Sequence, residues 1–162
     1  MIPRGPIGTI SMMSGVLVLT DGPKLRGAAR ILSVPKDSFE VRANFIKEGS
    51  SYFLNQVIIC NGLQVPSAPE EPYEIVVDSG EYLVVDGEFA EAIDLLQRLQ
   101  TECRDVLAHL QTSTVPWQFL IDKFGLSRGL VVRPPWGDGA YIAKVRREGT
   151  YFEIRCDVFN SR

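Results

Sequence analysis

The sequence is poor in the residues from which catalytic sites are most often built. Its 162 residues include one histidine and three widely separated cysteines, Cys60, Cys103 and Cys156. No Cys-x-x-Cys spacing occurs, and the odd number argues against both a disulfide framework and a zinc site. Single cysteines of this kind are expected to be small buried hydrophobic residues. The sequence therefore points away from redox chemistry and from a metal or other cofactor.

The one histidine, His109, has a neighbour that could orient it. Asp105 precedes it by four residues, so the two side chains would meet on one face of a helix. A carboxylate that orients an imidazole is half of a nucleophilic site. However, the chain contains no Gly-x-Ser-x-Gly or similar nucleophile motif. We interpret the pair as a surface interaction on a helix, and we expect a protein that is not an enzyme.

Phosphate-binding loops and long hydrophobic runs are also missing. Neither Gly-x-Gly-x-x-Gly nor Gly-x-x-x-x-Gly-Lys-Ser/Thr occurs, which argues against nucleotide-driven chemistry. No window approaches the ~20 apolar residues of a membrane span. The apolar run Val16 to Leu19 is shorter than the core of a secretory signal, which needs about 7–15 apolar residues. These absences favour a cytoplasmic protein with no membrane partner.

What is present is the composition of a globular protein. Hydrophobic residues make up 45% and charged residues 23% of the chain, which suffices for a core. No repeat or change in composition divides it, so we expect one domain over residues 1–162. The net charge of −3 is uneven: nine acids and no base lie from Glu70 to Asp94, whereas eight bases and five acids occur from Val115 onward. Such a dipolar surface can steer a charged partner.

The first half of the chain has the pattern of short strands joined by tight turns. Phe39, Val41, Ala43 and Phe45 alternate with polar residues, which predicts a strand with one buried face. The run from Val57 to Cys60 is apolar on both faces and predicts a central strand. Further strands are expected at residues 16–20, 28–34 and 130–133.

A second hairpin is predicted over residues 73–86, with its turn at residues 79–80. Ile75 would lie opposite Val84 and Val77 opposite Tyr82, so that both pairs share one apolar face. Cross-strand pairs of this kind stabilise an antiparallel sheet. The first half is therefore expected to form an antiparallel meander, either a curled sheet or an open barrel.

The turn of this hairpin is the one place where acidic side chains are expected to gather. Asp78 would lie opposite Glu81, with Glu74 and Asp86 nearby, and such oxygen ligands suit a divalent metal. No EF-hand spacing is present, however, and Asp86 points to the other face in this register. We interpret the cluster as a hydrated acidic turn and expect no metal site.

A long amphipathic helix is predicted over about residues 88–111, with Asp86 as its N-cap. Apolar residues recur at spacings of three and four from Phe89 to Leu110, as on one face of a helix. The stripe is wider than a coiled-coil seam, which favours packing on the sheet over pairing with another helix.

A short second helix is predicted from Trp117 to Phe124. Pro116 suits the first turn of a helix, and Gly125 suits its end. The predicted fold class is therefore α+β. It consists of an antiparallel β-meander covered by one long amphipathic helix, with the short second helix and a closing C-terminal hairpin.

The closing hairpin is predicted to run from Tyr141 to Arg147 and from Tyr151 to Val158. In its second strand the residues expected to face the core are Phe152, Ile154, Cys156 and Val158. The residues expected in water are Glu153, Arg155 and Asp157. This hairpin is the candidate nucleic-acid surface, because it carries Lys144, Arg146, Arg147 and Arg155, with Tyr141, Tyr151 and Trp136 available for stacking. Its acidic neighbours favour a solvated face instead.

The loop that contains Pro134, Pro135 and Trp136 is the candidate protein-interaction site. An exposed tryptophan held by two prolines loses little entropy on binding, which suits an interface anchor. The same side chain could equally close the bottom of the core. We expect a non-catalytic structural or protein-interaction subunit of a macromolecular assembly. Its partners would be other protein subunits or further copies of the chain, and a nucleic-acid-binding accessory protein is the alternative.

Overall fold

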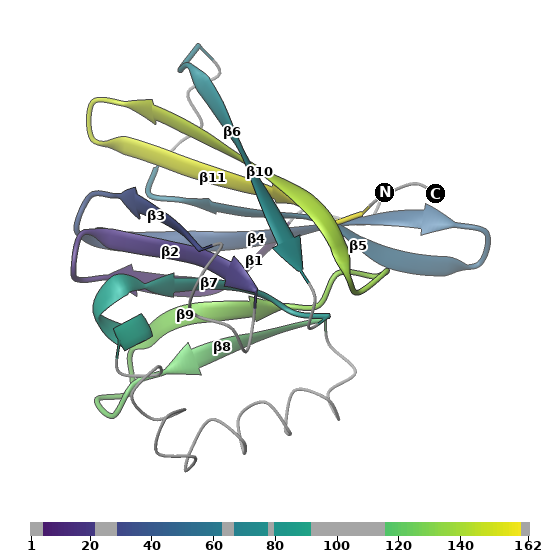
Figure 1. The fold of residues 1–162 in the computed structure, drawn as a ribbon, viewed down its shortest axis with the longest axis horizontal. Helices are drawn as coiled ribbons and strands as arrows, with labels where there is room; N and C mark the ends of the chain where they lie inside the picture. Colours follow the sequence, from purple (N-terminus) through teal and green to yellow (C-terminus); the bar gives the residue numbers. More distant parts are fainter. Residues whose placement is uncertain (1–4, 22–28, 63–66, 78–79, 92–115, 160–162) are drawn as a thin grey trace.

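The computed structural model describes residues 5–21, 29–62, 67–77, 80–91 and 116–159. Within them, eleven strands form two antiparallel sheets (Figure 1). The six-stranded sheet has the order β1 (Gly5–Met12), β4 (Asp37–Glu48), β5 (Ser51–Cys60), β11 (Tyr151–Asp157), β10 (Gly139–Glu148) and β6 (Glu70–Val77). The five-stranded sheet has the order β3 (Arg30–Ser33), β2 (Val16–Asp21), β7 (Tyr82–Asp86), β9 (Ser127–Val132) and β8 (Trp117–Ile121).

One hydrophobic core fills the space between the two sheets. Alternate residues along each strand point into it, as the pleat of a strand requires. The buried cluster draws on both sheets and includes Val41, Val57, Ile154, Leu19 and Val84. The burial of this apolar surface is the main force that holds the sheets together.

The two sheets also meet along their edges. β1, at one edge of the six-stranded sheet, lies against β9, and β6, at the other edge, lies against β2. Gly8 of β1 leaves room for the Phe119 ring, since a Cβ atom at this position would lie 2.5 Å from that ring. On the other side, Arg30 Nε of β3 donates a hydrogen bond to the carbonyl oxygen of Glu74 at 3.4 Å. The sandwich is therefore held together along both sides.

Several strand predictions are confirmed. Phe39, Val41 and Ala43 of β4 are buried in the core. Residues Val57 to Cys60 are buried on both faces, and β5 is a central strand between β4 and β11, as predicted. Strands β2 and β3 form where the sequence predicts them, and β9 overlaps the predicted interval 130–133 but begins three residues earlier. Strands β10 and β11 form the predicted closing hairpin.

The predicted hairpin over residues 73–86 is wrong. β6 pairs with β10 in the six-stranded sheet, whereas β7 pairs with β2 and β9 in the five-stranded sheet. Ile75 and Val84 both reach the core, but from opposite sheets. Alternation shows which face of a strand is buried, and two strands that face each other across a core have the same pattern as two strands that pair.

The predicted α+β class is wrong as well. Strands contain 69% of the described residues and helix contains 4%, with no helix of seven or more residues among them. Residues 87–91 are helical, whereas residues 92–115, where most of the predicted long helix falls, lie outside the described residues. Asp86, the predicted N-cap, is the last residue of β7. The described part of the chain is therefore an all-β structure of two sheets.

The predicted short helix at residues 117–124 is also a strand. Residues Trp117–Ile121 form β8, which pairs with β9. Gly125 stands in the turn between the two strands with a φ of 82°. It therefore forms part of a hairpin turn, whereas the sequence predicts that it ends a helix. Trp117 and Phe119 pack against the core between the sheets, whereas Leu120 belongs to a second cluster, so apolar contacts on both faces and the pairing with β9 outweigh the local helix signals.

Candidate binding face of the six-stranded sheet

The outer face of the six-stranded sheet carries most of the side chains that the sequence singles out. Ala143 and Val145 of β10 point into the core, so Lys144 and its alternate neighbours lie on the outer face. The registers of β4, β5, β11 and β10 set the outer side chains in rows across the sheet. Residues that are far apart in the sequence thereby become neighbours.

One of these rows is a chain of polar contacts across four strands. Asn44 Nδ2 of β4 donates to Gln56 Oε1 of β5 at 3.0 Å. Gln56 Nε2 in turn donates to Asp157 Oδ1 of β11 at 2.7 Å. Lys144 Nζ of β10 lies 3.6 Å from Asp157 Oδ2. The row thus ends in an ion pair and leaves Lys144 with a carboxylate partner.

The structure brings together three of the four predicted nucleic-acid-binding residues, and it places acids beside them. Arg146 Nη2 lies 2.9 Å from Glu70 Oε2, and Arg155 Nη2 lies 3.1 Å from the same oxygen. Glu153 Oε2 is 3.9 Å from Arg146 Nε. The hydrogen bond from Arg146 lowers the pKa of Glu70. The positive charge on this face is therefore balanced locally.

Arg147 and the two tyrosines lie apart from this group. The Arg147 guanidinium lies 5.2 Å from the centre of the Phe152 ring, and its Nη1 donates to the carbonyl oxygen of Ser33 at 2.8 Å. Tyr141 is buried, and its hydroxyl donates to the carbonyl oxygen of Gly137. Tyr151 is also buried and donates to Glu153. Neither tyrosine offers an exposed ring on which a base could stack.

Trp136 lies in an aromatic patch on the surface, which consists of Phe53, Trp136 and Phe159. The Trp136 and Phe53 rings are stacked, with centroids 5.7 Å apart and planes 28° apart. Phe159 lies 5.9 Å from Trp136 and 6.1 Å from Phe53. The Trp136 side chain remains 38% exposed. Of the two roles predicted for Trp136, a surface anchor agrees with this geometry and a plug of the core does not.

The backbone that presents Trp136 is held in place. Gly137 N donates to the carbonyl oxygen of Pro134 at 3.0 Å and closes a turn around Pro135 and Trp136. Tyr141 Oη donates to the carbonyl oxygen of Gly137 at 2.7 Å. Pro134 is buried and Pro135 is half-buried. The loop is thus anchored at its base while the Trp136 ring faces solvent.

Other exposed apolar side chains of the six-stranded sheet lie on β10, which follows this loop, and on its neighbour β6. Ile142 of β10 is 45% exposed and Val76 of β6 is 47% exposed. Val76 is paired with Ala140, which is also exposed. The sequence argument identifies Trp136 through its flanking prolines. It misses Phe53 and Phe159, because their meeting depends on the pairing of distant strands.

The remaining residues with chemical potential do not form a site among the described residues. Asp78, Asp105 and His109 lie outside them. Glu81 is buried. In the described ranges, no three His, Cys, Asp or Glu side chains lie close enough to hold a metal ion. Asp86 is fully buried and bound to Arg128.

The two cysteines in the described part of the chain, Cys60 and Cys156, are both buried, as the sequence predicts. Burial raises the pKa of the Cys60 thiol, and it raises the pKa of the Cys156 thiol to about 12. A thiol with a raised pKa is a poor nucleophile at neutral pH. Cys103 lies outside the described residues.

The chain matches no protein-family model, no curated protein and no solved structure. Within the described residues there is no helix long and apolar enough to cross a membrane. A proposal for the function of this protein therefore rests on the geometry of the outer face.

Proposed function

We propose that this protein is a non-catalytic, protein-binding subunit of a larger cytoplasmic assembly, and that its partner protein docks on the aromatic patch. The observation that carries the proposal is the Trp136 ring. It is more than a third exposed, stacked on Phe53 and presented by an anchored turn.

An anchored aromatic side chain suits a protein interface for two reasons. Tryptophan is enriched among the residues that contribute most to binding, because its large ring excludes much water. A ring that is already ordered loses little conformational entropy when a partner covers it. Ile142 and Val76 would extend the apolar centre, and the charged residues further along the sheet would supply a polar rim.

The alternative, a nucleic-acid-binding accessory protein, would use Lys144, Arg146 and Arg155. Each of these side chains already has a carboxylate neighbour in Asp157 or Glu70. A phosphate would have to compete with those carboxylates, which weakens the counterion release on which nucleic-acid affinity depends. The local charge balance therefore supports the protein-binding proposal.

The proposal is tested with a photo-crosslinking amino acid placed in the source cells at position 142, whose strand partner Asp157 lies two residues before Phe159 of the patch. The control carries the same amino acid at position 31 of β3, where Ile31 is 71% exposed in the other sheet. We expect one discrete protein adduct from position 142, absent from position 31. Adding Trp136→Ala should remove this adduct, and adding Trp136→Phe should retain part of it.

Three results would overturn the proposal. The first is an adduct that forms equally from both positions. The second is an adduct that survives Trp136→Ala. The third is a nuclease-sensitive adduct that is lost with Arg146→Ala and Arg155→Ala, which would favour the nucleic-acid alternative. Circular dichroism of each variant shows whether the fold is intact.

A further inference from the structure

The two sheets have four edge strands, β1, β6, β3 and β8, and the first three carry features that oppose the addition of a further strand. β3 has only four residues, and Arg147 Nη1 donates to the carbonyl oxygen of Ser33 at 2.8 Å. β6 contains a proline and three glutamates, and Arg30 Nε donates to the carbonyl oxygen of Glu74. β1 contains a proline with a bulge beside it. Short length, proline, charge and bulges are the usual protection of a sheet edge.

The fourth edge strand, β8, has no such protection. Its five residues, Trp117 to Ile121, include no charged residue and no proline. It pairs with β9 and stands last in its sheet (Figure 1). Among the strands that the structure describes, none pairs with its other side. An unprotected edge of this kind is a template for a strand of another chain.

The register with β9 shows which backbone groups face the free side of β8. Arg133 N donates to the carbonyl oxygen of Pro116 at 2.8 Å, so these two residues form a hydrogen-bonded pair. Such pairs alternate with non-hydrogen-bonded pairs along an antiparallel ladder. Gln118 therefore bonds to β9, whereas the N–H and C=O groups of Trp117 and Phe119 point away from it. Two donors and two acceptors of the backbone thus face the free side.

We propose that two copies of this chain pair through β8, so that their five-stranded sheets join into one continuous sheet. The two strands run antiparallel about a two-fold axis at Gln118. In this register Trp117 of each copy lies opposite Phe119 of the other, and each such pair exchanges two backbone hydrogen bonds. All the backbone groups on the free side thereby find partners. The contact is the same for both copies, as a two-fold interface requires.

The side chains of β8 suit a second copy as the occupant. Gln118 faces its own counterpart across the axis, where each amide can donate to the other. Trp117 lies beside Phe119 of the other copy, and aromatic cross-strand pairs stabilise a sheet. Pro116 lies opposite Leu120 of the other copy in a pair that exchanges no hydrogen bond, so its missing N–H removes nothing. An edge without charge also does not repel an identical edge.

The dimer leaves the aromatic patch free. Trp117 contacts Phe45, which packs against the core on the inner face of the β4–β5 hairpin. Phe53 of the patch precedes the buried Leu54 in β5 and therefore lies on the outer face of this hairpin. The proposal thus goes beyond the proposed function, because a different protein can still dock on the patch.

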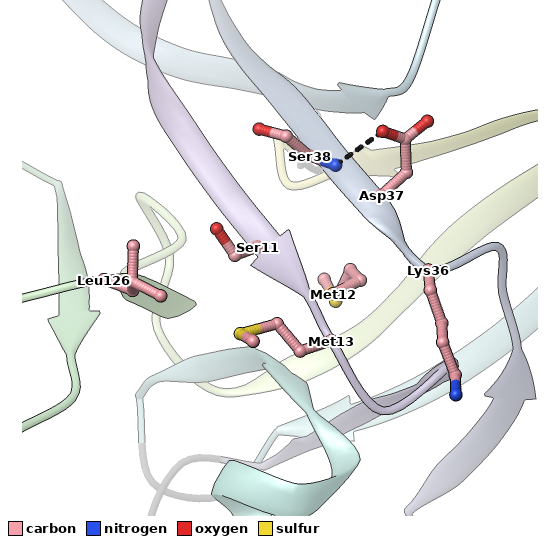
Figure 2. A pocket seen from close by; sticks show the side chains of 7 residues that line it. All are labelled: Ser11, Met12, Met13, Lys36, Asp37, Ser38 and Leu126. Atoms are coloured by element: carbon pink, nitrogen blue, oxygen red, sulfur yellow. Dashed lines mark hydrogen bonds between the residues drawn. The ribbon is translucent and has the colours of Figure 1, made fainter. Parts of the chain in front are cut away.

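The open pocket near the β8–β9 turn is also separate from the dimer contact (Figure 2). None of its lining residues belongs to β8. Figure 2 shows Leu126 across the pocket from Met13. Lys36 and Asp37 are neighbours in the lining, so the pocket has no preference for one charge. The free backbone groups of β8, in contrast, select a strand.

The test is analytical ultracentrifugation of the purified chain over a range of concentrations. We expect a monomer–dimer equilibrium. Gln118→Lys and Gln118→Glu should each weaken the dimer about tenfold or more, because each places two like charges opposite one another at the axis. An equimolar mixture of the two variants should restore a dimer with one copy of each. Native mass spectrometry detects this dimer when one variant carries a heavy isotope label. Mixing would not rescue a variant that had simply failed to fold.

Two controls separate this contact from other surfaces. Ile31→Lys places a charge at a 71% exposed position on the opposite edge of the same sheet, and it should leave the dimer unchanged. Trp136→Ala removes the ring at the centre of the aromatic patch and should also leave the dimer unchanged. Failure of the dimer is thus distinguishable from failure of the patch as a binding site.

Amide hydrogen exchange tests the register itself. The amides of Gln118 and Leu120, which bond to β9, should be protected at every concentration, whereas those of Trp117 and Phe119 should become protected only as the dimer forms. Three results would overturn the proposal. One is a chain that stays monomeric at all concentrations, and another is a dimer that both charge variants form as well as wild type. The third is protection of the Trp117 and Phe119 amides in the monomer, which would mean that another segment of the same chain pairs with this edge.

Discussion

At the scale of single residues, Gly8 is a position where β1 packs closely against Phe119 of the five-stranded sheet. A Cβ atom at this position would lie 2.5 Å from the Phe119 ring, so the ring would have to move. Gly8→Ala is expected to lower the free energy of unfolding by about 1–3 kcal/mol, as overpacking does in other proteins. Urea denaturation measures the change.

The same strand offers a control. A Cβ atom at Gly5 would meet nothing within 4 Å, so Gly5→Ala should have little effect. Phe119→Leu, combined with Gly8→Ala, should cost less than the sum of the two single changes, because the smaller side chain relieves the clash. Equal losses for Gly5→Ala and Gly8→Ala would rule out the Phe119 contact as the cause.

Glu81 gives the stability a dependence on pH. Burial raises its pKa, and the nearby Asp21 raises it further, whereas Arg133 opposes both. The folded chain therefore retains this proton to a higher pH than the unfolded chain does. The contribution of Glu81 to stability is largest below the unfolded pKa near 4.5, and it falls as the pH rises through the folded pKa.

Glu81→Gln isolates this effect, because glutamine keeps the shape and loses the titration. We expect wild type to lose stability relative to Glu81→Gln as the pH rises from about 4.5 toward neutrality. Denaturation of both proteins at matched pH values gives the difference. A difference that stays flat over this range would show that the side chain titrates normally in the folded protein.

The sequence predicts the direction of many side chains, but not what surrounds them. Alternation correctly assigns Ile154 and Cys156 to the core. It also predicts that Glu153 lies in water, yet Glu153 is 3% exposed and accepts a hydrogen bond from Tyr151 at 3.1 Å. Period-two patterning gives the face of a sheet. It carries no information on whether other side chains cover that face.

At the scale of elements, the partner of each strand is the least predictable quantity. The hairpins β4–β5 and β10–β11 follow from the sequence, because a short turn joins two strands of matching pattern. The pairing of β6 with β10 and of β7 with β2 joins segments far apart in the chain. No local signal specifies such pairs, since any apolar strand face can pack beside any other.

The buried ion pair of Asp86 and Arg128 connects three elements of the structure. Asp86 at the end of β7 binds Arg128 of β9 and Ser14 of the β1–β2 turn. Asp86→Ala would leave the Arg128 charge buried without its closest partner, and we expect a loss of about 3–5 kcal/mol in the free energy of unfolding. Urea denaturation measures this loss.

Replacement of both charges is the matched control. Asp86→Ala combined with Arg128→Met also removes the buried guanidinium that has lost its closest partner, so the double variant should lose less stability than Asp86→Ala alone. If the double variant is instead the less stable of the two, the ion pair itself contributes net stability. That outcome would contradict the interpretation that the loss comes from a buried guanidinium that keeps only Asp122 as a close partner.

At the scale of the whole molecule, the two sheets share one core, and this determines how the chain should unfold. Tyr82 of the five-stranded sheet and Cys156 of the six-stranded sheet meet inside it, with Tyr82 Oη 3.5 Å from Cys156 Sγ. The core cluster takes buried side chains from both sheets. Neither sheet would keep its apolar face covered if the other unfolded, so the two should unfold together.

The chain has two tryptophans, and they report on different parts of the molecule. Trp117 of β8 packs against Phe45 of β4 and so reports on a contact between the sheets, whereas Trp136 contacts Phe53 of the six-stranded sheet. Trp136→Phe leaves only the first probe, and Trp117→Phe leaves only the second. For each variant we expect the urea midpoint from fluorescence to equal the midpoint from circular dichroism, since a two-state transition looks the same to every probe. A fluorescence midpoint that differs from the circular dichroism midpoint of the same variant would mean that the sheets unfold separately. One shared core would then not be what holds the molecule together.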